Sequence, residues 1–293
     1  GIYIPAGKAP LASTVLMTGV PAKLAGVKEI IITTPAGKDG KVHPAILFCA
    51  QLLGIKEIYK VGGAQAIACL ALGAERIKKV DKIVGPGGVW VSSAKVYAQS
   101  QGLCGIDTLA GPSEILILSD GSVPFEFAKA DLLAQLEHGK DSWAFLISTN
   151  KNYLKQLISQ ELRRAKNLVL IYAENENQML ELANQIAPEH LELHLEKPEQ
   201  ALPHLSTAPA IFIGGYSPVA IGDYLAGPNH SLPTAGRARF DSPLGVWDFM
   251  KRQNIIKVDK KTYQKLAKTG MIFSELEGLK AHCHSIRIRL KSS

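Results

Sequence analysis

Cysteine is scarce in this chain, and no cysteine has the spacing of a metal site or a disulfide framework. The 293 residues include four cysteines and no Cys-x-x-Cys pair. Small secreted proteins that depend on disulfides carry a denser set. The sequence therefore excludes that class and predicts free, buried thiols in a cytoplasmic protein. The four positions are Cys49, Cys69, Cys104 and Cys283.

Aromatic residues and long apolar runs are also few. Phe, Trp and Tyr make up 6% of the residues, and the 33 Lys and Arg residues are scattered. A nucleic-acid surface needs clustered basic residues and aromatic stacking platforms, so we predict no nucleic-acid partner. No apolar run reaches the roughly 18 residues of a membrane helix, so we predict no membrane association. The formal net charge of +7 suits an acidic or phosphate-bearing ligand instead.

What the sequence does contain is a regular alternation of strand and helix patterns. Runs of Ile, Val and Leu, each followed by a helical pattern, favour parallel strands covered on both faces. We therefore predict an α/β fold with two doubly wound, Rossmann-like parallel sheets. The expected strands are 29–34, 57–61, 82–84, 115–118, 143–148, 168–172 and 211–213, and the expected helices are 44–53, 64–72, 89–100, 125–138, 153–166 and 178–186.

The pattern changes at two places, 108–113 and 235–243, which we expect to be domain boundaries. They divide the chain into Rossmann-like domains at 1–112 and 113–242 and a small C-terminal domain at 243–293. About fifty residues are too few for comfortable stability alone, so the last domain is expected to pack on another subunit. Within it, 247–257 and 262–280 have helical patterns, and 285–290 has the pattern of a basic strand.

Two short motifs contain residue types that can bind a metal or move a proton. Gln135 and His138 are three residues apart on a predicted helix and therefore share a face, although a histidine at a helix end is more often a cap. Glu189 and His190 follow a helix-ending proline, where an acid and an imidazole can act as a general acid/base pair. A solvated pair at a helix end is the alternative.

Further candidates lie in loops and near the C-terminus. The loop 222–234 places Asp223 and His230 among residues that break regular structure, which is typical of a functional loop. Glu277 and His282 lie in a polar stretch that could equally be a surface turn. The combination of Gln, His and Asp suits Zn²⁺, Mn²⁺ or Co²⁺.

Glycine-rich turns follow two of the predicted strands. The residues 85–88 (GPGG) and 62–65 (GGAQ) each open a helix, where backbone N–H groups can bind phosphate. The first lacks the third glycine of the dinucleotide fingerprint, so the pattern alone is weak.

Several motifs in register resemble the histidinol dehydrogenase family from Gly1 to about Leu290. They are 1–7 (GIYIPAG), 62–67 (GGAQAI), 80–87 (VDKIVGPG), 110–114 (AGPSE), 135–139 (QLEHG), 187–191 (APEHL) and 227–234 (GPNHSLPT). The resemblance implies zinc-dependent oxidation of L-histidinol to L-histidine through the aldehyde, with two NAD molecules reduced in turn. It also implies a homodimer with a shared active site.

The resemblance assigns a role to each motif residue. Zinc would be held by Gln135, His138 and Asp223 of one subunit and by His282 of its partner, and Glu189 and His190 would be the catalytic pair. The remaining matches are to substrate contacts at Ser113, His230 and Glu277, besides His190 and the four zinc ligands, and to NAD contacts at Tyr3, Gln65 and Gly88.

Two departures from the family pattern are visible. Gly88 stands where the family usually has Asn, which predicts weakened or altered cofactor binding. The family also carries an N-terminal segment that this sequence lacks, so we expect the second Rossmann-like domain to be incomplete and the chain to fold poorly by itself or to be part of a longer protein. The alternative functions are a related dehydrogenase of another small alcohol and an inactive homologue that acts as an interaction module.

Overall fold

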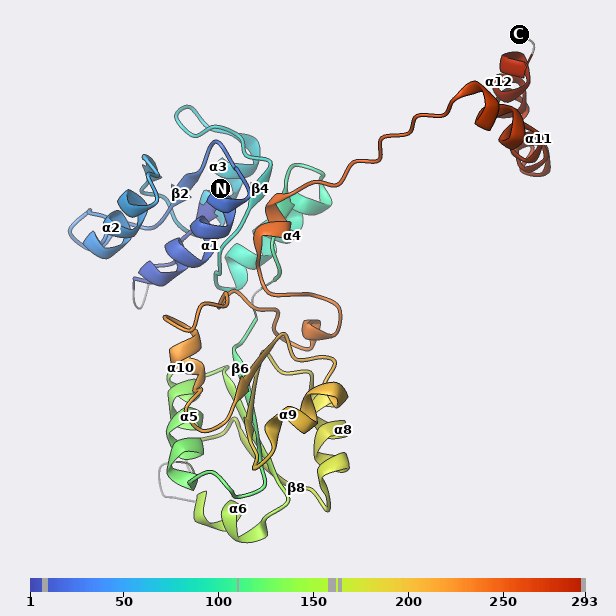
Figure 1. Ribbon diagram of the computed structural model, residues 1–293. Helices are drawn as coiled ribbons and strands as arrows, with labels where there is room; N and C mark the ends of the chain where they lie inside the picture. Colours follow the sequence, from blue (N-terminus) through green and yellow to red (C-terminus); the bar gives the residue numbers. More distant parts are fainter. Residues whose placement is uncertain (7–9, 110, 158–161, 163–164, 291–293) are drawn as a thin grey trace. The chain divides into compact units, whose positions relative to one another are not determined.

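The computed structural model describes residues 1–6, 10–109, 111–157, 162 and 165–290. The chain forms two compact units, Gly1–Met250 and Lys251–Ser293 (Figure 1). Most of the expected helix end at 158–166, and Ala110 of the expected boundary, lie outside the described residues. The boundaries at 112 and 242 stay a prediction. No helix of the described residues is long and apolar enough to cross a membrane.

The first sheet of the larger unit is built from short parallel strands. β1 (Ile2–Tyr3), β2 (Ile31–Thr33) and β3 (Glu57–Tyr59) pair in sequence order. An isolated parallel bridge from Ile2 to Val84 connects this sheet to the end of β4 (Lys82–Ile83), which pairs with β5 (Gly105–Ile106).

Helices cover both faces of the first sheet. Consecutive strand residues point to opposite faces: Ile32 packs with α1 (Ala12–Leu24) and α2 (Pro44–Leu52), whereas Ile31 packs with α3 (Gly63–Leu72) and α4 (Val89–Ser100). The predicted doubly wound arrangement of this part is therefore present.

The second sheet has five parallel strands in the order β10-β9-β6-β7-β8. These strands are β6 (Glu114–Ser119), β7 (Trp143–Ser148), β8 (Leu168–Tyr172), β9 (His190–His194) and β10 (Ala210–Ile213). One face packs against α5 (Phe125–Glu137), α6 (Lys151–Leu157) and α10 (Val219–Gly222), and the other packs against α8 (Glu176–Ile186) and α9 (Pro198–Ala201) (Figure 1). We call these the α5 face and the α8 face.

The side chains of β9 divide between these two faces. Leu191 and Leu193 belong to the apolar cluster on the α8 face. By strand alternation, His190, Glu192 and His194 point to the α5 face. All five residues of β9 are buried, so three polar side chains enter an otherwise apolar layer.

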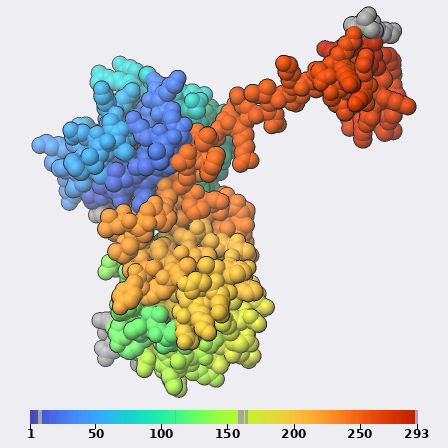
Figure 2. Space-filling model, in the orientation of Figure 1, coloured from blue at the N-terminus to red at the C-terminus, as the bar shows by residue number. Residues whose placement is uncertain are grey.

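Two of the expectations for the C-terminal region are wrong. The segment 247–257 is not a helix: only the 3₁₀ turn η3 (Val246–Phe249) forms, and the Asp248 carboxylate caps its start by accepting a bond from the Gly245 N–H. Residues 251–259 have no regular structure and are exposed (Figure 2). The run that follows η3 contains Ile255, Ile256 and Val258, whose β-branched side chains lower helix propensity.

The expected basic strand at 285–290 is instead the end of the helix α12 (Lys280–Leu290). α12 packs against α11 (Lys260–Leu276), the helix expected at 262–280, and the Tyr263 hydroxyl donates a hydrogen bond to the Ile286 carbonyl. Arg287 donates to Glu275 at the end of α11 and to Cys283. The second contact joins positions i and i+4 within α12, as a helix requires. Packing between the two helices therefore overrides the alternating apolar pattern.

The four cysteines are free, as predicted. Cys49, Cys104 and Cys283 are buried, and Cys69 is half-buried.

Candidate active site

The predicted acid/base pair lies at the amino-terminal edge of the second sheet. The Glu189 carboxylate accepts hydrogen bonds from the Ser113 hydroxyl (2.6 Å) and the Glu114 N–H (3.0 Å), both at Oε2. His190 Nδ1 lies 3.0 Å from the Glu114 carbonyl oxygen. A carbonyl can only accept, so Nδ1 carries the hydrogen and Nε2 of the neutral ring is left as the basic nitrogen.

Glu114 is a site residue that the sequence patterns did not reveal. It provides the backbone partners of both Glu189 and His190. Burial and the neighbouring Glu189 carboxylate raise the pKa of its own side chain. The signal available in the sequence was its place beside Ser113, at the start of a buried strand.

Three predicted metal ligands from two helices meet in one pocket. Gln135 lies in the last turn of α5, His138 is its C-cap, and Asp223 is the C-cap of α10. They line a pocket of about 30 Å³ together with Ile115 at the start of β6. The volume admits only about two water-sized particles. His230 joins this group, with Nδ1 lying 3.0 Å from the Asp223 carbonyl oxygen.

The other two predicted residues of this site belong to the smaller unit. His282 lies on α12, Glu277 is the C-cap of α11, and both side chains are exposed there. His284 also lies on α12, and positions two apart on a helix do not share a face, so it does not point with His282.

A second polar cluster lies deeper on the α5 face. Asp131, Glu192 and His194 each offer one ligand atom within 4.8 Å of the others. Among the described residues, this is the one group of three His, Cys, Asp or Glu side chains close enough to hold an ion. Burial, followed by the Glu192 carboxylate, raises the pKa of Asp131 to about 7. Sequence patterns did not reveal these residues, although Glu192 and His194 alternate with His190 along one strand.

The predicted cofactor contacts lie at the carboxyl ends of the first sheet's strands. Tyr3 ends β1, and its hydroxyl accepts a bond from the Gly63 N–H (3.2 Å) at the start of α3. Gln65 lies in the first turn of α3, and Gly88 is the N-cap of α4. Dinucleotides bind at this edge of doubly wound sheets. The acid/base pair, in contrast, lies at the amino edge of its own sheet.

Comparisons with known proteins cover nearly the whole chain. The family model described as histidinol dehydrogenase matches residues 1–290. The chain is 46% identical to histidinol dehydrogenase of Oceanobacillus iheyensis, covering 99% of this chain and 70% of that protein, and 47% identical to that of Thermococcus kodakarensis, covering 99% and 74%. The chain belongs to the histidinol dehydrogenase family.

Solved structures agree with this assignment. A crystal structure of histidinol dehydrogenase from Elizabethkingia anophelis superposes with a TM-score of 0.95 at 43% identity, over 100% of this chain and 70% of that one. A substrate-bound Staphylococcus aureus AldH matches with a TM-score of 0.51 at 13% identity, which indicates a shared fold alone.

The residues of this histidinol dehydrogenase family member fit a divalent cation at the pocket. Gln135, His138 and Asp223 offer an amide, an imidazole and a carboxylate, which suit borderline and hard cations. The Gln135 side chain is buried, and its Nε2 has no hydrogen-bond partner among the described residues. The amide oxygen is the atom that can bind a cation, because the nitrogen carries two hydrogens and acts only as a donor.

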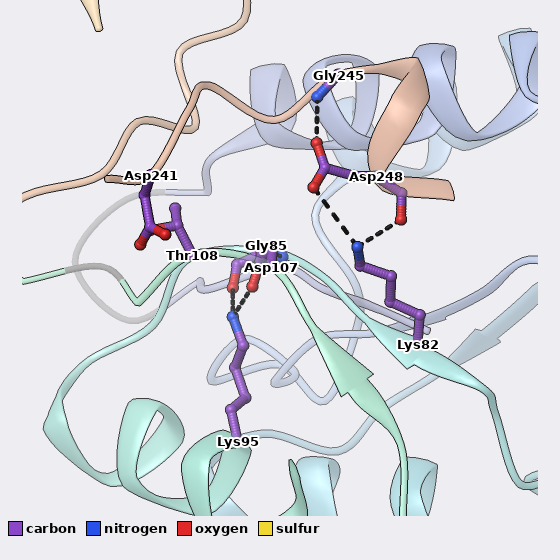
Figure 3. A network of polar contacts seen from close by, with 8 residues as sticks. All are labelled: Lys82, Gly85, Lys95, Asp107, Thr108, Asp241, Gly245 and Asp248. Atoms are coloured by element: carbon purple, nitrogen blue, oxygen red, sulfur yellow. Dashed lines mark hydrogen bonds and ion pairs between the residues drawn. The ribbon is translucent and has the colours of Figure 1, made fainter. Parts of the chain in front are cut away.

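A buried ion pair holds the glycine-rich turn of this family member in place. Lys95 donates to Asp107 and to the Gly85 carbonyl, and Asp107 accepts from the Gly85 N–H (Figure 3). Gly85 has a φ of +114°, and a side chain there would collide with the Tyr3 carbonyl. The network therefore fixes a turn at Gly85 that only glycine can make.

We expect Lys95→Met to lower the free energy of unfolding by about 3–5 kcal/mol, because it leaves Asp107 as an uncompensated buried charge. Urea denaturation followed by circular dichroism measures this. The double variant Lys95→Met/Asp107→Asn keeps an acceptor for Gly85 without the charge and should recover part of the loss. Equal loss in both variants would contradict the role given to the ion pair.

Gly88 is the position at which the family resemblance implies Asn. An added Cβ at Gly88 meets nothing within 4 Å, and φ is −68°. We therefore expect Gly88→Asn to be tolerated and to lower KM for NAD, because one added hydrogen bond is worth about 0.5–1.5 kcal/mol. That is about a 2- to 13-fold change. Steady-state kinetics with varied NAD test it, and Gly88→Ala, which adds no amide, should leave KM unchanged.

Proposed function

We propose that this chain oxidises L-histidinol through L-histidinal to L-histidine with Zn²⁺ bound and NAD as hydride acceptor. The observation that carries the proposal is that Gln135, His138 and Asp223 line one pocket at the sheet edge that also carries Glu189 and His190. Family membership and the intact motif residues support the same reaction.

His190 is the general base of the proposed mechanism. Its Nδ1–H is held by the Glu114 carbonyl, so Nε2 can take the hydroxyl proton of the alcohol as the hydride leaves. His190 is 4% exposed, which limits competition by bulk water. Once it has released the first proton, the same nitrogen can take the second one when the hydrated aldehyde is oxidised.

Glu189 activates the water that hydrates the aldehyde. Both of its hydrogen bonds from Ser113 and Glu114 use Oε2. Oε1 is therefore the oxygen that can accept a proton from water. In this arrangement Ser113 orients Glu189, besides the substrate contact implied by the family motif.

Gln135, His138 and Asp223 would hold Zn²⁺, and the partner subunit would complete the set through its copy of the position His282. Bound zinc supplies a Lewis acid that orients the amino alcohol and lowers the pKa of its hydroxyl. Tyr3, Gln65 and Gly88 would contact NAD at the edge of the first sheet. His230 and Glu277 would contact the substrate.

A homodimer in the cytoplasm is part of the proposal. In the smaller unit, the large apolar side chains Leu266, Phe273 and Leu276 are exposed on α11. Exposed apolar surface of this kind marks protein interfaces. A second copy of the chain that covers it would bring Glu277 and His282 to the site of its partner.

Metal analysis of the purified chain, combined with NADH formation from histidinol, tests the proposal. We expect one zinc ion per chain and, because the oxidation removes four electrons, two NADH for each histidinol consumed. Activity on other small alcohols without activity on histidinol would favour the related-dehydrogenase alternative. A chain that binds no zinc and makes no NADH would favour the interaction-module alternative.

A further inference from the structure

We propose that Glu192 is a positioning residue for the metal site, because it is hydrogen-bonded to the start of α10 and lies against Asp131 of α5, and the ends of these two helices carry Gln135, His138 and Asp223. The inference rests on the proposed function. It concerns a buried carboxylate that has no role in the mechanism above.

Glu192 fixes the start of α10. It lies in the middle of β9 and is fully buried, and its Oε1 accepts a hydrogen bond from the Val219 N–H at 2.8 Å. Val219 is the first residue of α10, and its carbonyl accepts the N–H of Asp223 at 2.9 Å. α10 has four residues, so a displacement at Val219 reaches Asp223 through a single turn.

Glu192 also faces α5. Its carboxylate lies in the cluster with Asp131 and His194, whose ligand atoms are within 4.8 Å of one another. Asp131 lies one turn before Gln135 and two turns before His138, so these three residues share a face of the helix. Asp131 also lines the same pocket as Gln135, His138 and Asp223.

Three elements therefore meet at one side chain, namely β9 with the catalytic His190, α5 with two proposed ligands and α10 with the third. A buried carboxylate is costly to desolvate, and an apolar residue of similar volume is often neutral or stabilising in its place. Stability alone is therefore a weak reason for a carboxylate at this position. Support of the metal ligands is a stronger reason for this carboxylate. Mutation of the groups that hold metal ligands in place typically lowers metal affinity by about 10–100-fold.

The first test compares zinc affinity of Glu192→Met and Glu192→Gln in the full-length protein, by competition with a chromophoric chelator. Gln keeps an oxygen for the Val219 N–H, whereas Met keeps the volume alone. We expect Glu192→Met to bind zinc about 10–100-fold more weakly and Glu192→Gln to stay within about threefold of the unmodified chain. Rescue by Gln distinguishes positioning from general packing.

The second test leaves Glu192 in place and removes its donor. Val219→Pro eliminates the N–H at the first helical position, where proline is tolerated, and Val219→Ala keeps it. We expect weaker zinc binding in Val219→Pro than in Val219→Ala. The comparison of Val219→Pro with Val219→Ala also tests the positioning role of Glu192 if Glu192→Met fails to fold.

Ser148→Ala is the matched control. Ser148 is fully buried at the opposite edge of the same sheet, where its hydroxyl accepts the Asn150 N–H at 3.0 Å. We expect zinc affinity to be unchanged in Ser148→Ala. A loss in Ser148→Ala as large as in Glu192→Met would show general destabilisation and overturn the inference.

Three further results would also overturn it. Unmodified zinc affinity in both Glu192→Met and Val219→Pro would remove the positioning role while leaving the proposed function intact. A second metal ion per chain, lost in Glu192→Met, would make Asp131, Glu192 and His194 a cation site of their own. Absence of zinc from the unmodified protein would overturn the proposed function and this inference together.

Discussion

His138→Ala is expected to abolish zinc binding and lower histidinol-dependent NADH formation by about 10³-fold or more. The imidazole is one of three proposed ligands that one chain contributes to the pocket. A Lewis acid supplies several kcal/mol of charge stabilisation, and each 1.36 kcal/mol is tenfold in rate. Because the His138 side chain is exposed, its removal should leave the unfolding temperature nearly unchanged.

Elemental analysis of the dialysed protein and a steady-state assay at saturating NAD measure these two effects. His204→Ala is the control, since His204 is an exposed histidine that uses only its carbonyl oxygen, as an acceptor for Asn184. It should keep both zinc and activity. A His138→Ala protein with full zinc content would remove this residue from the ligand set.

His190→Asn should lower turnover by about 10²–10⁴-fold, the usual contribution of a general acid/base, while zinc stays bound. The Asn side chain can still donate a hydrogen bond to the Glu114 carbonyl where Nδ1 donates now, so the local structure should persist. It offers no basic nitrogen in place of Nε2.

The measurement is kcat together with the metal content of the same preparation. Because the loss concerns proton transfer, zinc affinity and KM for NAD should change little. Loss of zinc in His190→Asn would mean that this imidazole is a ligand, and the division of roles between His190 and His138 would be wrong.

Much of the fold could be predicted where strands are continuous apolar runs. β7 and β8 begin and end where the sequence predicts, as does α4. The two-residue strands β1 and β5 are too short for a pattern, and α1 contains Pro21, which argues against a helix in local terms.

β9 shows why a polar strand was missed. Its sequence alternates His, Leu, Glu, Leu and His, which indicates a half-exposed strand or a turn. The structure buries all five residues because α5 and α10 bring Asp131 and the Val219 N–H against the polar face. Such partners are distant in sequence, and local spacing contains no information about them.

The candidate site could be predicted only in parts. Gln135 and His138 share a helix face by spacing alone. Asp223 reaches these two residues because α10 runs back along β10 and β9. This path of the chain depends on the whole sheet, so local spacing does not predict it. The C-terminal residues were assigned from family motifs, whereas their helical conformation depends on the packing of α11 against α12.

The placement of the acid/base pair at the amino edge of the second sheet leaves the opposite edge of that sheet available for protein engineering. The turn at Gly121 and Ser122 follows the carboxyl end of β6, a strand length away from Glu114. A fluorophore or affinity tag inserted at this turn would lie away from the candidate active site at Glu189 and His190. Immobilisation through this turn would likewise keep the attachment point a strand length away from Glu189 and His190.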